Sequence, residues 1–115
     1  MEILVKEYVL IPELTLFEYY DSLISRFFKI LPIFEGRDVF TKNKIYSDDV
    51  AIENYRKYIE NFIIEIYGTT KMIDNNLLIR LLSILNGMLE LNEHKTVKTC
   101  VFNCIDICKK LKRGC

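Results

Sequence analysis

The chain has 115 residues, half of them hydrophobic and 28% charged, which is the balance of a folded globular protein rather than a disordered one. This length suits one domain and is too short for two ordinary ones, so we expect a single domain over residues 1–115. Sixteen basic and sixteen acidic side chains give a formal net charge of zero. Because proteins that bind nucleic acid normally carry a net positive surface, this balance argues against a nucleic-acid partner.

The first third of the chain predicts one clear helix. Residues 3–11 are apolar without a clean period; a helix and an extended segment are both compatible with them, and we expect a short helix. Thr15 and Glu18 have the spacing of a capping box, which places a helix start at Thr15. Pro32 cannot continue a helical ladder, so this helix should end near Leu31. Its apolar residues recur at helical spacing, namely Leu16, Tyr20, Leu23, Phe27 and Leu31.

Residues 33–46 predict a connecting loop, and a second helix follows it. Ser47 is placed to cap this helix, and Asp48 and Asp49 occupy the first turn, where the positive end of the helix dipole favours acids. We expect Gly68 to end the helix in a left-handed conformation. The predicted buried stripe consists of Ile52, Tyr55, Ile59, Phe62 and Ile66.

Two further helices complete the predicted fold. Asp74 is placed to cap the third, whose apolar residues between Leu77 and Leu89 cover much of its circumference, as expected of a central helix. The polar residues 92–94 predict a short turn. A fourth helix then presents one apolar side, formed by Val97, Val101, Cys104, Cys108 and Leu111. Because short turns leave successive helices antiparallel, the sequence predicts an all-α fold, an antiparallel bundle of four to five helices.

The residue types that carry chemistry do not form a recognisable site. Cys100, Cys104 and Cys108 recur every four residues on the last helix. Eight helical residues rise about 12 Å, so the outer two thiols cannot share a zinc ion whose ligands lie at about 2.0–2.3 Å. His94 has no partner acid that would make it a base for a nucleophilic cysteine. We therefore expect core cysteines and no enzyme activity, metal or cofactor, with a thiolate metal site as the alternative.

Charge is distributed unevenly along the chain. Residues 1–92 hold ten Lys and Arg against fourteen Asp and Glu, whereas residues 93–115 hold six against two. The basic tail contains Lys109, Lys110, Lys112 and Arg113. The dipole at the end of a helix favours such cations. The run is short and lacks the interleaved aromatic residues of an RNA-binding patch, so we prefer this dipole explanation to an RNA or lipid site.

A recognition surface is the feature that remains. Tyrosine is favoured at interfaces because its ring buries apolar area while its hydroxyl keeps a hydrogen bond. Tyr19, Tyr46 and Tyr58 fall beside the apolar stripes and could be exposed. With the acids of the second helix they predict an anionic, aromatic patch for a basic partner, formed by Tyr46, Asp48, Asp49, Glu53, Tyr58 and Glu60. The alternative is that most tyrosines complete the edge of the core and that the acids are a solvated face.

The start of the chain gives an expectation about location. Residues 1–7 contain acids where a signal peptide needs a basic region. No apolar stretch in the sequence approaches the roughly 18 residues that span a bilayer. We therefore expect a cytoplasmic protein with reduced thiols and no membrane partner.

The third and fourth predicted helices resemble a known family. The stretch Ile79–Glu90, a brief polar turn, Val97-Lys98 and then Val101–Ile105 is similar to a helical hairpin of small bacterial immunity proteins. These proteins belong to polymorphic toxin systems, including contact-dependent growth inhibition. The likeness covers about residues 77–111 and consists of the hydrophobic pattern and a few polar positions.

The resemblance implies a cytosolic, non-enzymatic protein that binds a cognate toxin domain and blocks its active site. Many such toxins are nucleases with basic clefts, which an acidic face would match. One alternative is an interaction module such as a homodimeric helical subunit or a phage-encoded inhibitor. Another is a small enzyme or RNA binder that uses the cysteine stripe or the basic tail. Both a monomer and a homodimer are compatible with the sequence.

Overall fold

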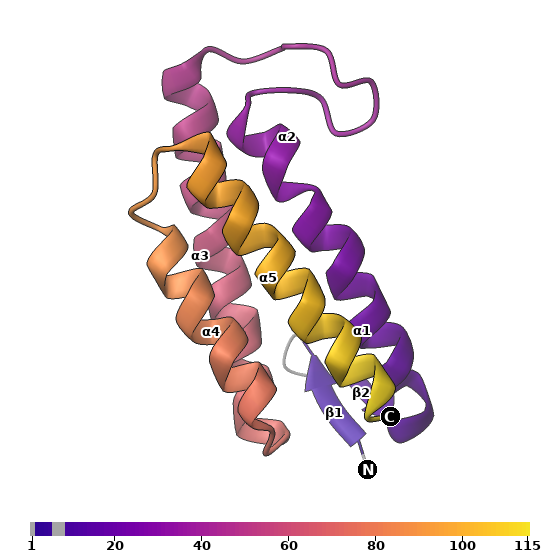
Figure 1. Cartoon of the computed structure of the whole chain (residues 1–115). Coiled ribbons are helices and arrows are strands. Elements are labelled where there is room, and N and C mark those ends of the chain that lie inside the picture. The colour runs from indigo at the N-terminus through magenta and orange to yellow at the C-terminus, as the bar shows by residue number, and fades with distance from the viewer. Residues whose placement is uncertain (1, 6–8) are drawn as a thin grey trace.

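The chain forms a bundle of helices preceded by a small hairpin (Figure 1). The computed structural model describes the backbone of residues 2–5 and 9–115, and side chains from Leu16 onward. In this part of the chain the elements are, in order, strands β1 (Glu2–Val5) and β2 (Val9–Pro12), then helices α1 (Glu13–Phe28), α2 (Ile30–Phe34), α3 (Asp48–Met72), α4 (Asn76–Met88) and α5 (His94–Arg113). The predicted helical fold is therefore confirmed.

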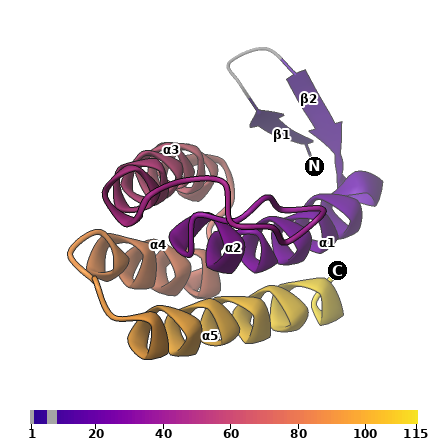
Figure 2. The ribbon, with the colours of Figure 1, turned by 90° about the horizontal axis from the view of Figure 1, so that it is seen from above.

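The N-terminal hairpin replaces the helix that we expected over residues 3–11. Strands β1 and β2 pair antiparallel, with Glu2 opposite Pro12 and Val5 opposite Val9. The helix prediction is thus wrong for residues 3–5 and 9–11, and residues 6–8 lie outside the described part of the chain. Apolar, partly β-branched residues suit a pleated strand, and strand β1 gains neighbours by contacting both α1 and α3. Figure 2 shows the hairpin beside α1, on the side away from α5.

The four longer helices form the walls of the bundle. Helix α3 packs against α4, α4 against α5, and α5 against α1, and each pair runs antiparallel (Figures 1 and 2). Helix α4 is therefore one wall, and the expectation of a central helix surrounded by others is wrong; Ile79 on its outer side is half exposed. The shared core is apolar, and its largest fully buried side chains include Leu23, Phe27, Ile59, Phe62, Ile66, Leu81, Leu85 and Met88.

The first predicted helix is shifted and divided in the structure. Helix α1 begins at Glu13, so Thr15 is not at its start and the capping-box prediction is wrong. It ends at Phe28, and α2 starts at Ile30. Pro32 has no backbone N–H, which leaves the carbonyl of Phe28 without its helical partner and breaks the ladder there. Pro32 itself lies in the first turn of α2, where no N–H is needed.

The starts of α3 and α4 are set by side-chain caps. The Ser47 hydroxyl accepts a hydrogen bond from the Val50 amide, which confirms the predicted cap of α3. Asn75, rather than the expected Asp74, caps α4: its side-chain oxygen accepts from the Leu77 amide at 2.9 Å. Both residue types offer a short side-chain acceptor, so the sequence located this start to within one residue.

Gly68 does not end α3. The helix continues through it to Met72 and is followed by Ile73 in an extended conformation. Gly68 is exposed, and a Cβ placed on it would meet no other atom within 4 Å. A helix stays intact through an exposed glycine when its flanking residues are held by packing, here by buried Ile66 and Thr69 on the opposite side.

Helices α1 and α3 are joined by long side chains, since their backbones stay more than 8 Å apart among the described residues. Arg26 donates to both carboxylate oxygens of Glu65, at 2.7 and 2.8 Å. The Tyr19 hydroxyl donates to the same carboxylate at 2.9 Å and lies 3.2 Å from the Thr69 hydroxyl. The Tyr58 hydroxyl donates to the Arg26 carbonyl at 2.9 Å. Tyr19 is only 8% exposed, so the expectation that it could be on the surface is wrong.

Two of the three cysteines of α5 lie in the core and the third lies at its edge. Cys104 and Cys108 are fully buried, as predicted, and Cys100 is partly buried. Burial raises the pKa of the Cys108 thiol to about 12 and raises the pKa of Cys104 further, so both are neutral thiols near pH 7. Among the side chains that the structure describes, from Leu16 onward, no three His, Cys, Asp or Glu residues gather closely enough to hold a metal ion.

No helix in the described part of the chain has both the length and the apolar character required to span a lipid bilayer.

Candidate functional site

The loop between α2 and α3, residues 35–47, is the longest irregular segment among the described residues and lies at one end of the bundle (Figure 1). It folds back on itself through backbone hydrogen bonds. The amides of Ile45 and Tyr46 both donate to the Gly36 carbonyl, at 2.9 and 3.0 Å. The Asp38 amide donates to the Asn43 carbonyl at 2.9 Å. The α2–α3 loop therefore has its own internal scaffold.

Side chains reinforce the tip of this loop. The carboxylate of Asp38 accepts from the amides of Phe40 and Thr41, at 2.8 and 2.9 Å. These two hydrogen bonds favour the ionised carboxylate and lower the pKa of Asp38. The Thr41 hydroxyl in turn accepts from the Asn43 amide. Consecutive backbone donors are thus satisfied locally, as in an Asx turn, and the backbone around Phe40 is fixed.

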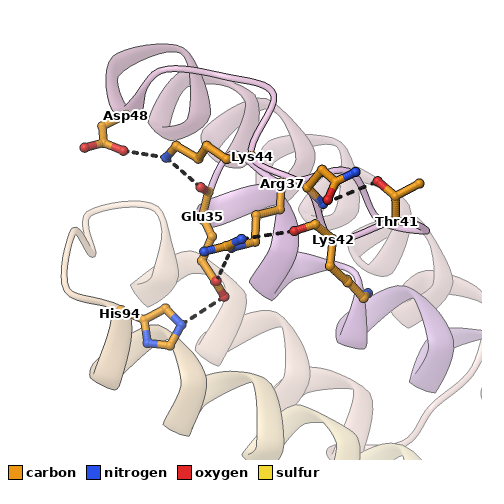
Figure 3. Close-up of polar contacts among 8 residues, drawn as sticks. Glu35, Arg37, Thr41, Lys42, Lys44, Asp48 and His94 are labelled. Carbon is orange, nitrogen blue, oxygen red and sulfur yellow. Dashed lines mark hydrogen bonds and ion pairs between the residues drawn. The ribbon is translucent and has the colours of Figure 1, made fainter.

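The base of the loop is held by four charged side chains (Figure 3). Arg37 donates to the carboxylate of Glu35 and to the carbonyl of Lys42, each at 3.0 Å. Lys44 donates to the Glu35 carbonyl at 2.9 Å and to the Asp48 carboxylate at 2.7 Å. Lys44 therefore joins the end of α2 to the first residue of α3 across the loop.

The loop is also tied to the last helix. His94, the first residue of α5, lies with Nε2 3.1 Å from the second carboxylate oxygen of Glu35 (Figure 3). The His94 ring is 6.2 Å from the ring of Phe34, which itself packs edge-on against buried Tyr55. The predicted turn residue His94 therefore positions the loop and has no thiol partner in the structure.

Two residues of the loop have positive φ angles. Gly36 has φ +73° and Lys42 has φ +64°. A non-glycine residue in this region costs roughly 1–2 kcal/mol. Lys42 is kept there because its amide donates to the Asp38 carbonyl and its ammonium donates to the Val39 carbonyl. The loop is therefore a single defined conformation held by many bonds, and it contains strain of the kind often found in binding loops.

Gly36→Ala is expected to loosen this loop. Besides the strain of a positive φ, the added Cβ would lie 2.8 Å from the Tyr46 carbonyl oxygen and 3.1 Å from the Ala51 side chain. We expect a loss of about 1–3 kcal/mol in the free energy of unfolding and faster amide exchange at residues 38–46. Urea unfolding and hydrogen exchange measure these effects. Gly68→Ala is the matched control, since nothing lies near Gly68; equal behaviour of the two variants would contradict the role assigned to Gly36.

The rigid loop displays apolar side chains to solvent. Phe40 at its tip is 85% exposed, the most of any large hydrophobic residue in the described part of the chain. Ile45, Tyr46 and Val50 are each more than 40% exposed. Beside them is a hollow of about 280 Å³, lined mainly by Ile33, Val39, Ile45, Tyr46 and Tyr58. The surface thus combines a protruding ring with an adjacent apolar depression.

The structure brings together most of the residues predicted to bind a partner. Tyr46, Asp48 and Asp49 lie at the junction of the loop and α3, and all three are exposed. Glu53 and Glu60 follow Asp49 along the outer face of α3, at offsets of four and eleven residues, and are exposed too. Tyr58 differs: it is partly buried, its hydroxyl bonds the α1 backbone, and its ring lines the hollow and packs on Phe62.

Cations lie among the acids of the patch that the sequence predicted to be anionic. The Asp48 carboxylate is paired with Lys44 at 2.7 Å, and Lys44 lowers its pKa. Lys57 lies 3.5 Å from Glu53 on the outer face of α3. Arg56 is exposed between these acids. The face has mixed charge because residues four apart on a helix are neighbours, and here Lys57 follows Glu53 and Arg56 precedes Glu60 at that spacing.

Phe40 was not among the predicted site residues. Helical spacing identifies buried faces, and a lone aromatic residue in an irregular segment has no period to reveal it. The available signal was local: Phe40 stands among polar residues in Arg37–Lys44, between two apolar helices. Its exposure becomes apparent only when the loop conformation is known.

Comparison with known proteins identifies no similar protein. No protein-family model matches this chain, and neither does any curated protein or any solved structure. The geometry of the described residues is therefore the main guide to function.

Proposed function

We propose that this protein is a non-enzymatic binding protein, an immunity protein that binds and neutralises a cognate bacterial toxin domain through the α2–α3 loop. The observation that carries the proposal is Phe40, 85% exposed on a loop held by its own hydrogen bonds. A partner that buries this ring gains apolar contact without having to order the loop first. Large side chains on preorganised backbone are the typical energetic centres of protein interfaces.

The residues around Phe40 suit the rim of such an interface. Tyr46, Asp48 and Asp49 lie on one side of the loop, and Glu53 and Glu60 extend the rim along α3. Mixed charges in this position orient a partner and select against wrong partners more than they add affinity. A toxin domain with basic side chains opposite the acids and an apolar pocket for Phe40 would be complementary.

The resemblance of residues 77–111 to immunity proteins supports the same class. These residues form α4 and most of α5, and the turn between the two helices lies at the same end of the bundle as the loop (Figure 1). The His94–Glu35 contact links the two segments directly. The hairpin that carries the likeness therefore supports the surface that displays Phe40.

A homodimeric interaction module is the second candidate. The observation in its favour is the outer face of α3, where Ile64 is 69% and Tyr67 is 51% exposed. These two residues lie one turn apart, so two copies could bury them against each other. Light scattering of the purified protein distinguishes a dimer from a monomer.

Phe40→Ala is expected to weaken binding to the cognate toxin domain about 30-fold or more, equivalent to about 2 kcal/mol. The experiment co-expresses the tagged protein with the C-terminal domain of the protein encoded by the gene immediately upstream, as the candidate toxin. It then measures recovery of a one-to-one complex, rescue of growth and the Kd by calorimetry. The reason for the loss is that the tip of the loop has no other aromatic ring to replace Phe40.

Ile64→Ala is the matched control, because it removes another strongly exposed apolar side chain, 69% exposed, outside the loop. Thermal unfolding should show that both variants fold. A complex whose Kd is the same with Phe40→Ala would reject the loop as the binding surface. Absence of any complex or rescue would reject the immunity function itself.

A further inference from the structure

The outer face of α1 and α5 combines cations with aromatic rings. Along α5, exposed residues recur every three or four positions, in the order Lys95, Lys98, Phe102, Asp106, Lys109 and Arg113. Helix α1 packs antiparallel beside α5 (Figures 1 and 2) and contributes Phe17, Asp21 and Phe28. With Lys112, these residues form what we call the α1–α5 face.

Three rings lie on this face. Phe17 and Phe28 are each 47% exposed and Phe102 is 43% exposed. The rings of Phe28 and Phe102 pack edge to face across the two helices, with centroids 6.1 Å apart. The Lys112 ammonium lies 4.9 Å from the centre of the Phe17 ring. Half of each ring is therefore fixed by the protein and the other half is open to a ligand.

The basic tail thus has aromatic neighbours that its own sequence lacks. A hollow of about 270 Å³ is lined by Phe17, Lys109, Lys112 and Arg113. Phe17 comes from the opposite end of the chain and is brought there by the packing of α1 on α5. One of the reasons for discounting a nucleic-acid patch, the lack of interleaved aromatic residues, does not hold in the folded protein.

The charge on the face is positive although the chain as a whole is neutral. Five cations, Lys95, Lys98, Lys109, Lys112 and Arg113, stand against Asp21 and Asp106, which leaves three positive charges. Asp21 is bonded to Lys112 at 2.6 Å. From Lys95 to Arg113 the helix rises about 27 Å, which matches the length of several nucleotides of an extended strand.

We propose that the α1–α5 face binds single-stranded nucleic acid. The lysines and Arg113 contact the phosphates, and unpaired bases stack on the open halves of the Phe17, Phe28 and Phe102 rings. Cationic grooves lined by aromatic side chains bind single strands in this way, since every base has a face that can stack. This activity goes beyond toxin binding and uses a different part of the molecule: Lys109–Arg113 lie at the end of the bundle opposite the α2–α3 loop (Figure 1).

Other anionic partners fit the face less well. Protein interfaces are enriched in arginine and depleted in lysine, whereas this face has four lysines and one arginine. A lipid surface requires apolar side chains free to insert, but Phe28 and Phe102 are packed on each other and carboxylates lie among them. A nucleic-acid duplex keeps its bases stacked internally, which would leave the three rings without a role.

The test is fluorescence anisotropy of the full chain with labelled oligouridine of about 12 nucleotides, a length within the usual site size. We expect micromolar binding at low salt, with the logarithm of the association constant falling against the logarithm of salt with a slope of about −3. Lys109→Glu with Arg113→Glu should weaken binding at least tenfold. The matched control is Lys57→Glu with Lys71→Glu, which makes the same charge change on α3 and should leave binding unchanged.

The rings are tested separately by Phe17→Leu and Phe102→Leu, which keep the packing volume but remove the stacking surface. We expect about fivefold weaker binding for each, with an unchanged salt slope. Absence of binding at low salt, equal weakening by the α3 control, or no effect of the leucine variants would overturn the proposal. Binding to phosphatidylglycerol vesicles without binding to oligouridine would assign the face to lipid instead and overturn it as well.

Discussion

Phe62→Ala is expected to lower the free energy of unfolding by about 3–5 kcal/mol. Phe62 is completely buried and is stacked on Phe27, with ring centroids 4.5 Å apart. Tyr58 packs against it edge-on at 6.0 Å, and the Arg26 guanidinium lies 4.5 Å from its ring centre. The ring therefore fills the space that separates the backbones of α1 and α3.

The loss should be near the upper end of this range because the cavity cannot easily close. The bonds between Arg26 and Glu65 hold the two helices at their present separation, so their backbones resist moving together. Urea unfolding followed by circular dichroism measures the change. Tyr67→Ala, half exposed on the outer side of the same helix, is the control and should change stability by less than about 0.5 kcal/mol. A loss of less than about 1.5 kcal/mol for Phe62→Ala would show that the bundle repacks around the missing ring.

The protein is expected to lose stability as the pH rises above about 8.5, the pKa of an unfolded cysteine. Burial raises the folded-state pKa of Cys108 to about 12 and raises that of Cys104 further. Between the unfolded and folded pKa values, the unfolded chain has released a proton that the folded protein still holds, so rising pH favours unfolding. The contribution of each thiol to stability is fully present below pH 8.5, and by pH 10 each thiol accounts for a loss of about 2 kcal/mol.

Tyrosines extend this effect to higher pH. Burial and nearby thiols raise the pKa of Tyr20 to about 12, and burial also raises the pKa values of Tyr19 and Tyr55. The stability that these tyrosines contribute is progressively lost above about pH 10, the pKa of an unfolded tyrosine. Rising pH again lowers the stability, because the folded protein binds the tyrosine protons more tightly than the unfolded chain does.

Urea unfolding between about pH 7 and pH 10 measures this dependence, and below about pH 9 the thiols account for nearly all of it because few unfolded tyrosines are ionised there. The double variant Cys104→Ala and Cys108→Ala should be less stable at neutral pH, because it leaves cavities, but its stability should change much less up to pH 10. A wild-type protein equally stable at pH 7 and pH 10 would show that the two thiols ionise as readily folded as unfolded. It would therefore contradict their burial in the core.

The sequence by itself predicted that the chain is helical and identified most of the core residues. Helical spacing identified the buried sides of α3 and α5, from Tyr55 to Ile66 and from Val97 to Leu111. It also placed Cys104 and Cys108 in the core and Ser47 at a helix start. These predictions succeeded because each depends on residues within one or two turns of each other, so the pattern and the structure that it favours are both local.

Helix boundaries and the first twelve residues were less certain from the sequence. Gly68 and Pro32 are ordinary signals for the end of a helix, yet α3 continues through the first and α2 includes the second. Tertiary packing outweighs the weak local preference of one glycine, and a proline is acceptable wherever its N–H is not required. The β1–β2 pairing gains from contact with α1 and α3, which no short segment reveals by itself.

Only the tertiary structure decided the candidate sites. The conformation that exposes Phe40 depends on bonds between α2, α3 and α5, including those of Glu35 with Lys44 and His94. The α1–α5 face exists because Phe17 and the basic tail, at opposite ends of the chain, pack side by side. A surface is defined by which side chains meet in space, and that depends on the packing of whole helices, whereas periodicity along the chain reports only which side of each helix is buried.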